Sequence, residues 1–231
     1  MISNNPLLLK GGSFSKTEVL GAPNSLVVRK SVSTINNREY GYVRLESQLR
    51  KLYLLSKYFP YITPPVLSVG ADDKLFFYEI PYYQNYLTCH QAISASIDTN
   101  LILESLVSFF DCCTHVTYPN PIGSLSAYIY SEMVNPIRCA CKILTESSTH
   151  NLSKAELAIF LGIASKAIDN LIHIANHFQK YQIFQSLNHG NLTLENMLWD
   201  TTQKSLILID PYAETICESL LGDLSQIYQS C

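Results

Sequence analysis

Two short apolar segments near the end of the chain, at 197–199 and 206–209, each adjoin a polar residue. Asn196 comes directly before the first segment, and Asp210 comes directly after the second. Both segments have the character of strands and are close enough in sequence to form a hairpin. Such a hairpin would bring Asn196 and Asp210 together, and their oxygens suit a hard cation such as magnesium. The sequence therefore predicts a metal site of the kind that phosphoryl transfer uses to neutralise phosphate charge.

The segment that leads into the first strand is His189-Gly190-Asn191-Leu192-Thr193-Leu194-Glu195-Asn196. It resembles the catalytic loop of the aminoglycoside phosphotransferase/choline kinase family, His-Gly-Asp-x-x-x-x-Asn. The resemblance implies that Asn196 and Asp210 hold Mg²⁺ on the phosphates of ATP, and that Asp223 steadies the loop. It also implies an α+β, protein-kinase-like fold of two lobes: residues 1–80 form a small antiparallel N-lobe sheet with one helix, and residues 81–231 form a mainly helical C-lobe.

Asn191 departs from the family pattern, because it stands where the family has its catalytic Asp. An amide cannot act as a base, although its carbonyl can still orient a hydroxyl. Since the transition state of phosphoryl transfer is loose, the change can leave slow catalysis. Three readings stay open: a slow phosphotransferase, a nucleotide-binding pseudokinase, or an active enzyme that carries a deliberate inactivating change.

The order of expected elements agrees with the two lobes. Turn formers and β-branched residues predict strands in the first third, and apolar spacings of three and four predict helices. In sequence order we expect a Gly-rich hairpin over 6–20, a strand at 26–32, a helix at 39–59, strands at 66–69 and 75–80, and helices at 101–115, 124–144 and 153–179. Ser153 and Glu156 fit a capping box at the start of the last helix.

The nucleotide-binding residues follow from the resemblance. The loop containing Gly11, Gly12 and Ser13 would cover the phosphates, since glycines let backbone N–H groups come close. Lys30 would contact the α- and β-phosphates. Strand alternation places Arg29 on the opposite face, which makes it the competing candidate.

Lys30 is expected to pair with a helix glutamate, for which Glu46 is preferred and Glu39 is the alternative. The connector that includes Glu79 and Ile80 would be the hinge whose backbone binds adenine. The aromatic run that follows could line the pocket or belong to the core. It consists of Tyr78, Tyr82, Tyr83 and Tyr86.

Composition narrows the class of protein. A net charge of −3 disfavours a nucleic-acid partner, although ten of the sixteen Lys/Arg precede residue 81 and thirteen of the nineteen Asp/Glu follow residue 80. This asymmetry suits a basic polyphosphate-binding half and an acidic metal-binding half, or reflects chance. Seven cysteines without a paired Cys-x-x-Cys predict neither a disulfide framework nor zinc.

The expected partners are ATP and a small molecule with an acceptor hydroxyl, with no membrane partner. The N-terminal residues lack a basic region and a long apolar run, so the chain is expected to be cytoplasmic. Helices that usually complete the acceptor side in this family would follow residue 231. The chain is therefore expected to be a domain of a longer protein.

Overall fold

The computed structural model describes residues 7–9, 15–22, 25–35, 38–146, 152–212 and 218–230, apart from the side chains of 7, 8, 38, 39 and 117–122. The chain divides into two compact units. Unit 1 comprises 1–116 and 187–231, and unit 2 comprises 117–186. This division differs from the lobe boundary expected after residue 80. The two-lobe division itself stays a prediction.

Unit 1 contains an antiparallel five-stranded sheet in the order β1-β2-β3-β5-β4. Side chains alternate across it, as strand geometry requires, so that every second residue of β5 faces the core. Its strands are β1 (Leu7–Leu8), β2 (Lys16–Leu20), β3 (Val27–Ser33), β4 (Ser68–Ala71) and β5 (Leu75–Pro81).

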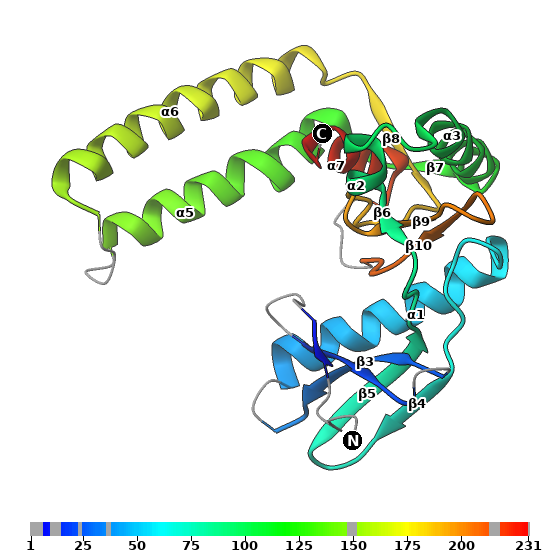
Figure 1. Ribbon diagram of the computed structural model, residues 1–231. Coiled ribbons are helices and arrows are strands. Elements are labelled where there is room, and N and C mark those ends of the chain that lie inside the picture. The colour runs from blue at the N-terminus through cyan, green and yellow to red at the C-terminus, as the bar shows by residue number, and fades with distance from the viewer. Residues whose placement is uncertain are drawn as a thin grey trace. The chain divides into compact units, whose positions relative to one another are not determined.

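Helix α1 (Val43–Tyr58) packs against this sheet after a short π-helical turn, η1 (Arg38–Tyr42) (Figure 1). Leu45, Leu49 and Leu52 recur on one face of the helix and are buried with Val28 and other core residues of β3 and β5. Burying a leucine side chain stabilises the fold by about 1.5–3 kcal/mol. The repeat of leucines therefore fixes which face of α1 meets the sheet.

A second core in unit 1 surrounds a three-stranded sheet in the order β10-β9-β6. Trp199 is fully buried at its centre, and the indole Nε1 donates to Asp98 Oδ2 over 3.0 Å. The elements of this region are β6 (Leu87–Thr88), α2 (Cys89–Ser94), α3 (Thr99–His115), β9 (Met197–Asp200), β10 (Ser205–Leu208) and α7 (Leu220–Ser230).

Unit 2 is an antiparallel strand pair joined to a helical hairpin. Helices α5 and α6 lie side by side and run in opposite directions (Figure 1). The elements are β7 (Thr117–Ser124), α4 (Leu125–Ile129), η2 (Tyr130–Val134), α5 (Asn135–Glu146), α6 (Lys154–His177) and β8 (Gln182–Ser186). Among the described residues, α6 is the helix that is long and apolar enough, by length and composition alone, to cross a membrane.

The predicted fold class is confirmed, since an antiparallel sheet with one helix precedes a mainly helical region. The capping box predicted at Ser153 and Glu156 forms at the start of α6. The expected helix at 124–144 contains the π-helical turn η2 between α4 and α5. Strand β7 was not predicted, because its two prolines indicated a break rather than a strand.

Candidate functional site

The segment 189–196, called the HGN loop below, is held in place by side chains of α7. Asp223 accepts from the backbone N–H of His189 and of Gly190, each over 2.6 Å. Gln226 accepts from Leu192 N over 2.6 Å, and Ser230 accepts from Leu194 N over 3.1 Å. Asp223, Gln226 and Ser230 recur at helical spacing on one face of α7. The structure thus gives Asp223 the steadying contact that the resemblance implied, and it adds two residues that the sequence had not indicated.

Gly190 is required by the shape of the HGN loop. Its φ angle is +82°, in the region that favours glycine, and an added Cβ would lie 2.0 Å from the carbonyl oxygen of Tyr212. Tyr212 N also donates to the His189 carbonyl over 3.0 Å. The HGN loop and the residues after Asp210 therefore pack backbone to backbone.

The structure brings Asn191, Asn196 and Asp210 together. The Asn196 side-chain amide donates to the backbone carbonyl of Asn191 over 2.9 Å. The Asn191 side-chain amide donates to the backbone carbonyl of Asp210 over 3.0 Å. The backbone of Ile209 also donates to the Asn196 carbonyl, over 2.9 Å. Asp210 has a φ angle of +58°, a conformation that costs free energy for a residue other than glycine. Asn191 thus uses its side chain to hold the Asp210 backbone.

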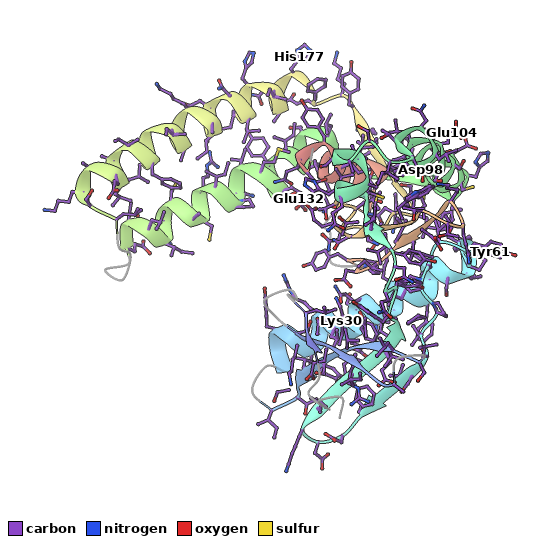
Figure 2. The ribbon with its side chains drawn as sticks, viewed as in Figure 1. Lys30, Tyr61, Asp98, Glu104, Glu132 and His177 are labelled. Atoms are coloured by element: carbon purple, nitrogen blue, oxygen red, sulfur yellow. The ribbon has the colours of Figure 1, made fainter. Side chains whose placement is uncertain are left out.

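Lys30, which is labelled in Figure 2, belongs to β3 and forms an ion pair with Asp210. It is only 4% exposed, and its Nζ lies 2.5 Å from Asp210 Oδ1. A buried ammonium needs such a partner because its desolvation is costly. Arg29 points to the other face of the sheet, where its guanidinium pairs with Glu79 over 2.6 Å. Of the two candidates for the phosphate-contacting residue, Lys30 is therefore the one at the site.

The predicted pair between Lys30 and Glu46 is wrong for this structure. Glu46 instead pairs with Arg50, one turn along α1, over 3.0 Å. Glu46 follows the buried Leu45 and so projects beside the core-facing stripe rather than within it. The alternative, Glu39, has a side chain outside the described residues.

Gln48 is the polar residue of α1 that faces the sheet. It is buried, and its Oε1 accepts from the hydroxyl of Tyr78 over 3.2 Å. Tyr78 lies opposite Lys30 in the β3–β5 ladder. A neutral hydrogen bond therefore occupies the region next to Lys30 where the resemblance implied a glutamate.

A pocket of about 270 Å³ opens next to Lys30 and Asp210. Both residues line it, and so does Thr17, whose buried hydroxyl has no hydrogen-bond partner among the described residues. The other lining residues are Leu9, Val28, Ile80, Pro81, Tyr82, Tyr83, Gln84, Tyr86, Leu198 and Ile209. The pocket is thus apolar with one polar end, which is the common character of small-molecule sites.

The predicted hinge residues have different outcomes. Ile80 lines the pocket, as a hinge residue should, but Glu79 does not. The Glu79 carbonyl accepts from Leu67 N over 2.8 Å, so it is engaged within the sheet rather than open to adenine. Glu79 and Ile80 point to opposite faces of the sheet, so of the two only Ile80 lines the pocket, and adenine binding by this hinge stays a prediction. Gly11, Gly12 and Ser13 lie outside the described residues.

The aromatic run serves both purposes that the sequence left open. Tyr78 is fully buried in the core between β5 and α1, and burial raises the pKa of its phenol well above the usual value. Tyr82, Tyr83 and Tyr86 line the pocket instead, and the rings of the last two lie 4.9 Å apart between centroids. This part of the pocket offers aromatic surface to a planar ring.

Buried ionisable groups surround the start of the HGN loop. Burial lowers the pKa of His189 to about 3, so its ring is neutral, and it raises the pKa of Asp223 to about 6. Lys51 of α1 is 2% exposed, and its Nζ lies 2.8 Å from Asn188 Oδ1 and 3.1 Å from Glu218 Oε1. Sequence analysis missed Lys51, because a lysine in an amphipathic helix is ordinarily solvent-exposed.

Asn196 and Asp210 fit a magnesium ion that also binds phosphate. The Asn196 amide nitrogen donates to the backbone carbonyl of Asn191, so the side-chain oxygen is the atom that would face a cation, and Asp210 is partly exposed next to the pocket. Within the described ranges, no group of three or more His, Cys, Asp or Glu side chains could hold a metal. Mg²⁺ commonly takes only one or two carboxylates and completes its shell with phosphate and water.

A larger cavity of about 690 Å³ shares no lining residue with this pocket. It is lined mainly by apolar side chains near the end of α1 and along α3, among them Phe59, Ile62 and Phe109. Its lining includes neither Lys30 nor Asp210, whereas both line the smaller pocket. Size alone therefore does not identify the site, and the smaller pocket is the candidate.

Comparison with solved structures finds 51 matching chains. One is a thermostable mutant of the aminoglycoside phosphotransferase APH(4)-Ia, in its apo form. The match has a TM-score of 0.59 and 13% sequence identity, and it covers 91% of this chain and 67% of that chain. The chain has the protein-kinase-like fold of an aminoglycoside phosphotransferase. No family model matches the sequence, and no curated protein matches it. At this identity, the kinase-like fold is what the two proteins demonstrably share.

Proposed function

We propose that this chain binds ATP with Mg²⁺ in the 270 Å³ pocket and transfers the γ-phosphate to a hydroxyl of a small molecule. The observation that carries the proposal is the ion pair between the buried Lys30 and the partly exposed Asp210 at the polar end of that pocket. Lys30 would contact the α- and β-phosphates, and the tyrosine-lined apolar part would receive adenine. The fold shared with an aminoglycoside phosphotransferase supports this assignment.

The transfer itself would depend on position rather than on a strong base. The acceptor oxygen forms a bond to the γ-phosphorus as the bond from that phosphorus to the β-phosphate oxygen breaks, and ADP leaves. Bound Mg²⁺ would neutralise charge on the phosphate oxygens, with Asn196 and Asp210 as its protein ligands. Asn191 could orient the hydroxyl through its carbonyl, and the hydroxyl proton would pass to the transferred phosphate or to water. Turnover would accordingly be slow.

A second candidate is nucleotide binding without turnover. The hydrogen bond from the Asn191 amide to the Asp210 carbonyl favours it, because this contact needs a donor and an ionised Asp has none. On this reading, Asn191 belongs to the architecture of a binding site.

Calorimetric titration of ATP with and without Mg²⁺ tests the binding step. The variant Lys30→Met should weaken ATP binding by at least about tenfold, because charge-assisted hydrogen bonds to phosphate contribute about 1.5–3 kcal/mol each. Arg29→Met is the matched control, since Arg29 lies on the other face of the sheet, and its affinity should remain near that of the wild type. Equal affinities in all three proteins, or no ATP binding by any, would contradict the proposal.

A transfer assay separates the two candidates. ADP formation would be followed with a panel of amino alcohols, sugars and aminoglycosides as acceptors, in the wild type and in Asn191→Asp. Acceptor-dependent ADP formation by the wild type supports the phosphotransferase. Binding of ATP with no turnover by the wild type on any acceptor supports the second candidate.

A further inference from the structure

Lys51 contacts Asn188, the residue before the HGN loop, and is not among the residues that line the pocket. Its ammonium is almost completely buried, and its partners are the Asn188 side-chain oxygen at 2.8 Å and the Glu218 carboxylate at 3.1 Å. Burying an ammonium is costly unless it is paired and hydrogen-bonded. The two contacts meet that requirement, so the position of Lys51 is well defined.

The two partners of Lys51 lead to the two elements that shape the loop. Asn188 is fully buried and immediately precedes the HGN loop, so a contact to its side chain fixes where the loop begins. Glu218 lies just before α7, the helix whose Asp223 binds the first two backbone amides of the loop. One ammonium therefore joins α1 to the loop and to its support.

The same face of α1 also contacts the sheet that carries Lys30. Gln48 precedes Lys51 by three residues, which places both side chains on one side of the helix. Gln48 accepts from Tyr78, which lies opposite Lys30 in the ladder. Helix α1 therefore makes buried polar contacts both with the sheet that carries Lys30 and with Asn188, the residue that leads into the HGN loop.

We infer that Lys51 is a positioning residue, which sets the HGN loop relative to α1 so that Asn196 meets the metal on a nucleotide bound by Lys30. The inference rests on the proposed function. Lys51 lines no part of the pocket and acts through Asn188 and Glu218. Replacing Lys51 should therefore weaken Mg²⁺ binding more than it weakens nucleotide binding.

The first measurement needs no ligand. Hydrogen exchange would be compared in the wild type, in Lys51→Met and in Lys57→Met, which makes the same change at an exposed position of α1. Backbone amides of His189, Gly190 and Leu192 should exchange faster by about tenfold or more in Lys51→Met, since the buried Asn188 and the partly buried Glu218 both lose the ammonium that they contact. Equal protection of these amides in the Lys51→Met and Lys57→Met proteins would overturn the inference.

The second measurement separates positioning from general stability. In Lys51→Met, ATP affinity without Mg²⁺ should match the wild type, whereas the gain in affinity on adding Mg²⁺ should fall by about tenfold, as when groups that orient metal ligands are removed. An equal loss with and without Mg²⁺ would show a general structural role and refute the positioning role.

Two further variants keep the test decisive. If Lys51→Met does not fold, the double variant Lys51→Met/Glu218→Gln removes both charges together, and Glu218→Gln alone keeps an acceptor for Lys51. In both variants the gain in ATP affinity on adding Mg²⁺ should fall, and it should fall less in Glu218→Gln. An undiminished gain in both variants would overturn the inference. If the wild type binds no ATP, the proposed function fails, and the exchange comparison then tests only whether Lys51 holds the HGN loop in place.

Discussion

The side-chain amide of Asn191 donates a hydrogen bond to the backbone carbonyl of Asp210 over 3.0 Å. Asp210 has a left-handed backbone at this point, and its carboxylate pairs with the buried Lys30. The residue in the base position of a kinase-like loop therefore takes part in fixing the conformation of the residue that would bind the metal.

Replacing Asn191 with Asp should destabilise the protein. An ionised carboxylate cannot donate to the Asp210 carbonyl and would be repelled by it, so we expect a loss of about 1–3 kcal/mol. Denaturant unfolding at pH 7 measures this loss. Asn170→Asp, the same change at an exposed position of α6, should stay within about 0.5 kcal/mol of the wild type. Similar stabilities of the two variants would show that the Asn191 amide contributes little.

Two glycine substitutions should change the free energy of unfolding in opposite directions. Gly190→Ala combines a φ of +82° with a Cβ 2.0 Å from the Tyr212 carbonyl oxygen, so it should cost at least about 1–3 kcal/mol. Gly162→Ala lies within α6 and its Cβ would meet no atom within 4 Å, so it should stabilise the protein by about 0.5–1 kcal/mol. Thermal unfolding of both variants checks the pair. A harmless Gly190→Ala would contradict the tight packing of the HGN loop.

Sequence patterns predicted the parts of the site that depend on local periodicity. Strand alternation separated Lys30 from Arg29, and the apolar segments around Asn196 and Asp210 indicated a hairpin. The Lys30–Glu46 pair failed because Glu46 lies one position, about 100°, around the helix from the buried Leu45, and so projects beside the core-facing stripe. Lys51 was missed for a different reason: its partners are more than 130 residues away, and no local pattern marks a lysine as buried.

The pH dependence of stability should reflect two opposing groups near the HGN loop. Burial raises the pKa of Asp223 from 3.8 to about 6, so its contribution favours folding below about pH 4 and is lost as pH rises to about 6. Burial lowers the pKa of His189 from 6.5 to about 3, so its contribution is present above about pH 6.5 and is lost as pH falls. Between about pH 4 and 6 the two contributions oppose each other.

In the variant Asp223→Asn, the pH dependence of stability should show the contribution of His189 without that of Asp223. Its free energy of unfolding should fall on acidification from pH 6.5 to pH 4, with a slope steeper than that of the wild type by up to about 1.4 kcal/mol per pH unit. Denaturant unfolding at several pH values measures the slopes. Asp169→Asn, at an exposed position of α6, serves as the control and should keep the wild-type slope. A wild-type slope in Asp223→Asn would mean that Asp223 does not titrate in this range.

Thr17→Val should distinguish a contribution of the Thr17 hydroxyl to ATP binding from a contribution to the stability of the fold. The Thr17 hydroxyl is buried in the pocket lining and has no partner among the described residues, so the near-isosteric valine should leave the ligand-free protein equally stable or more stable by about 1 kcal/mol. ATP affinity should fall by about three- to tenfold if the hydroxyl bonds to the nucleotide, since such a bond contributes about 0.5–1.5 kcal/mol. Thermal unfolding with and without ATP measures both effects. Thr145→Val, at an exposed position of α5, should leave ATP binding unchanged. Loss of stability without loss of affinity would instead assign the Thr17 hydroxyl to the fold, because a hydroxyl that waits unpaired for a ligand contributes to binding and not to the stability of the free protein.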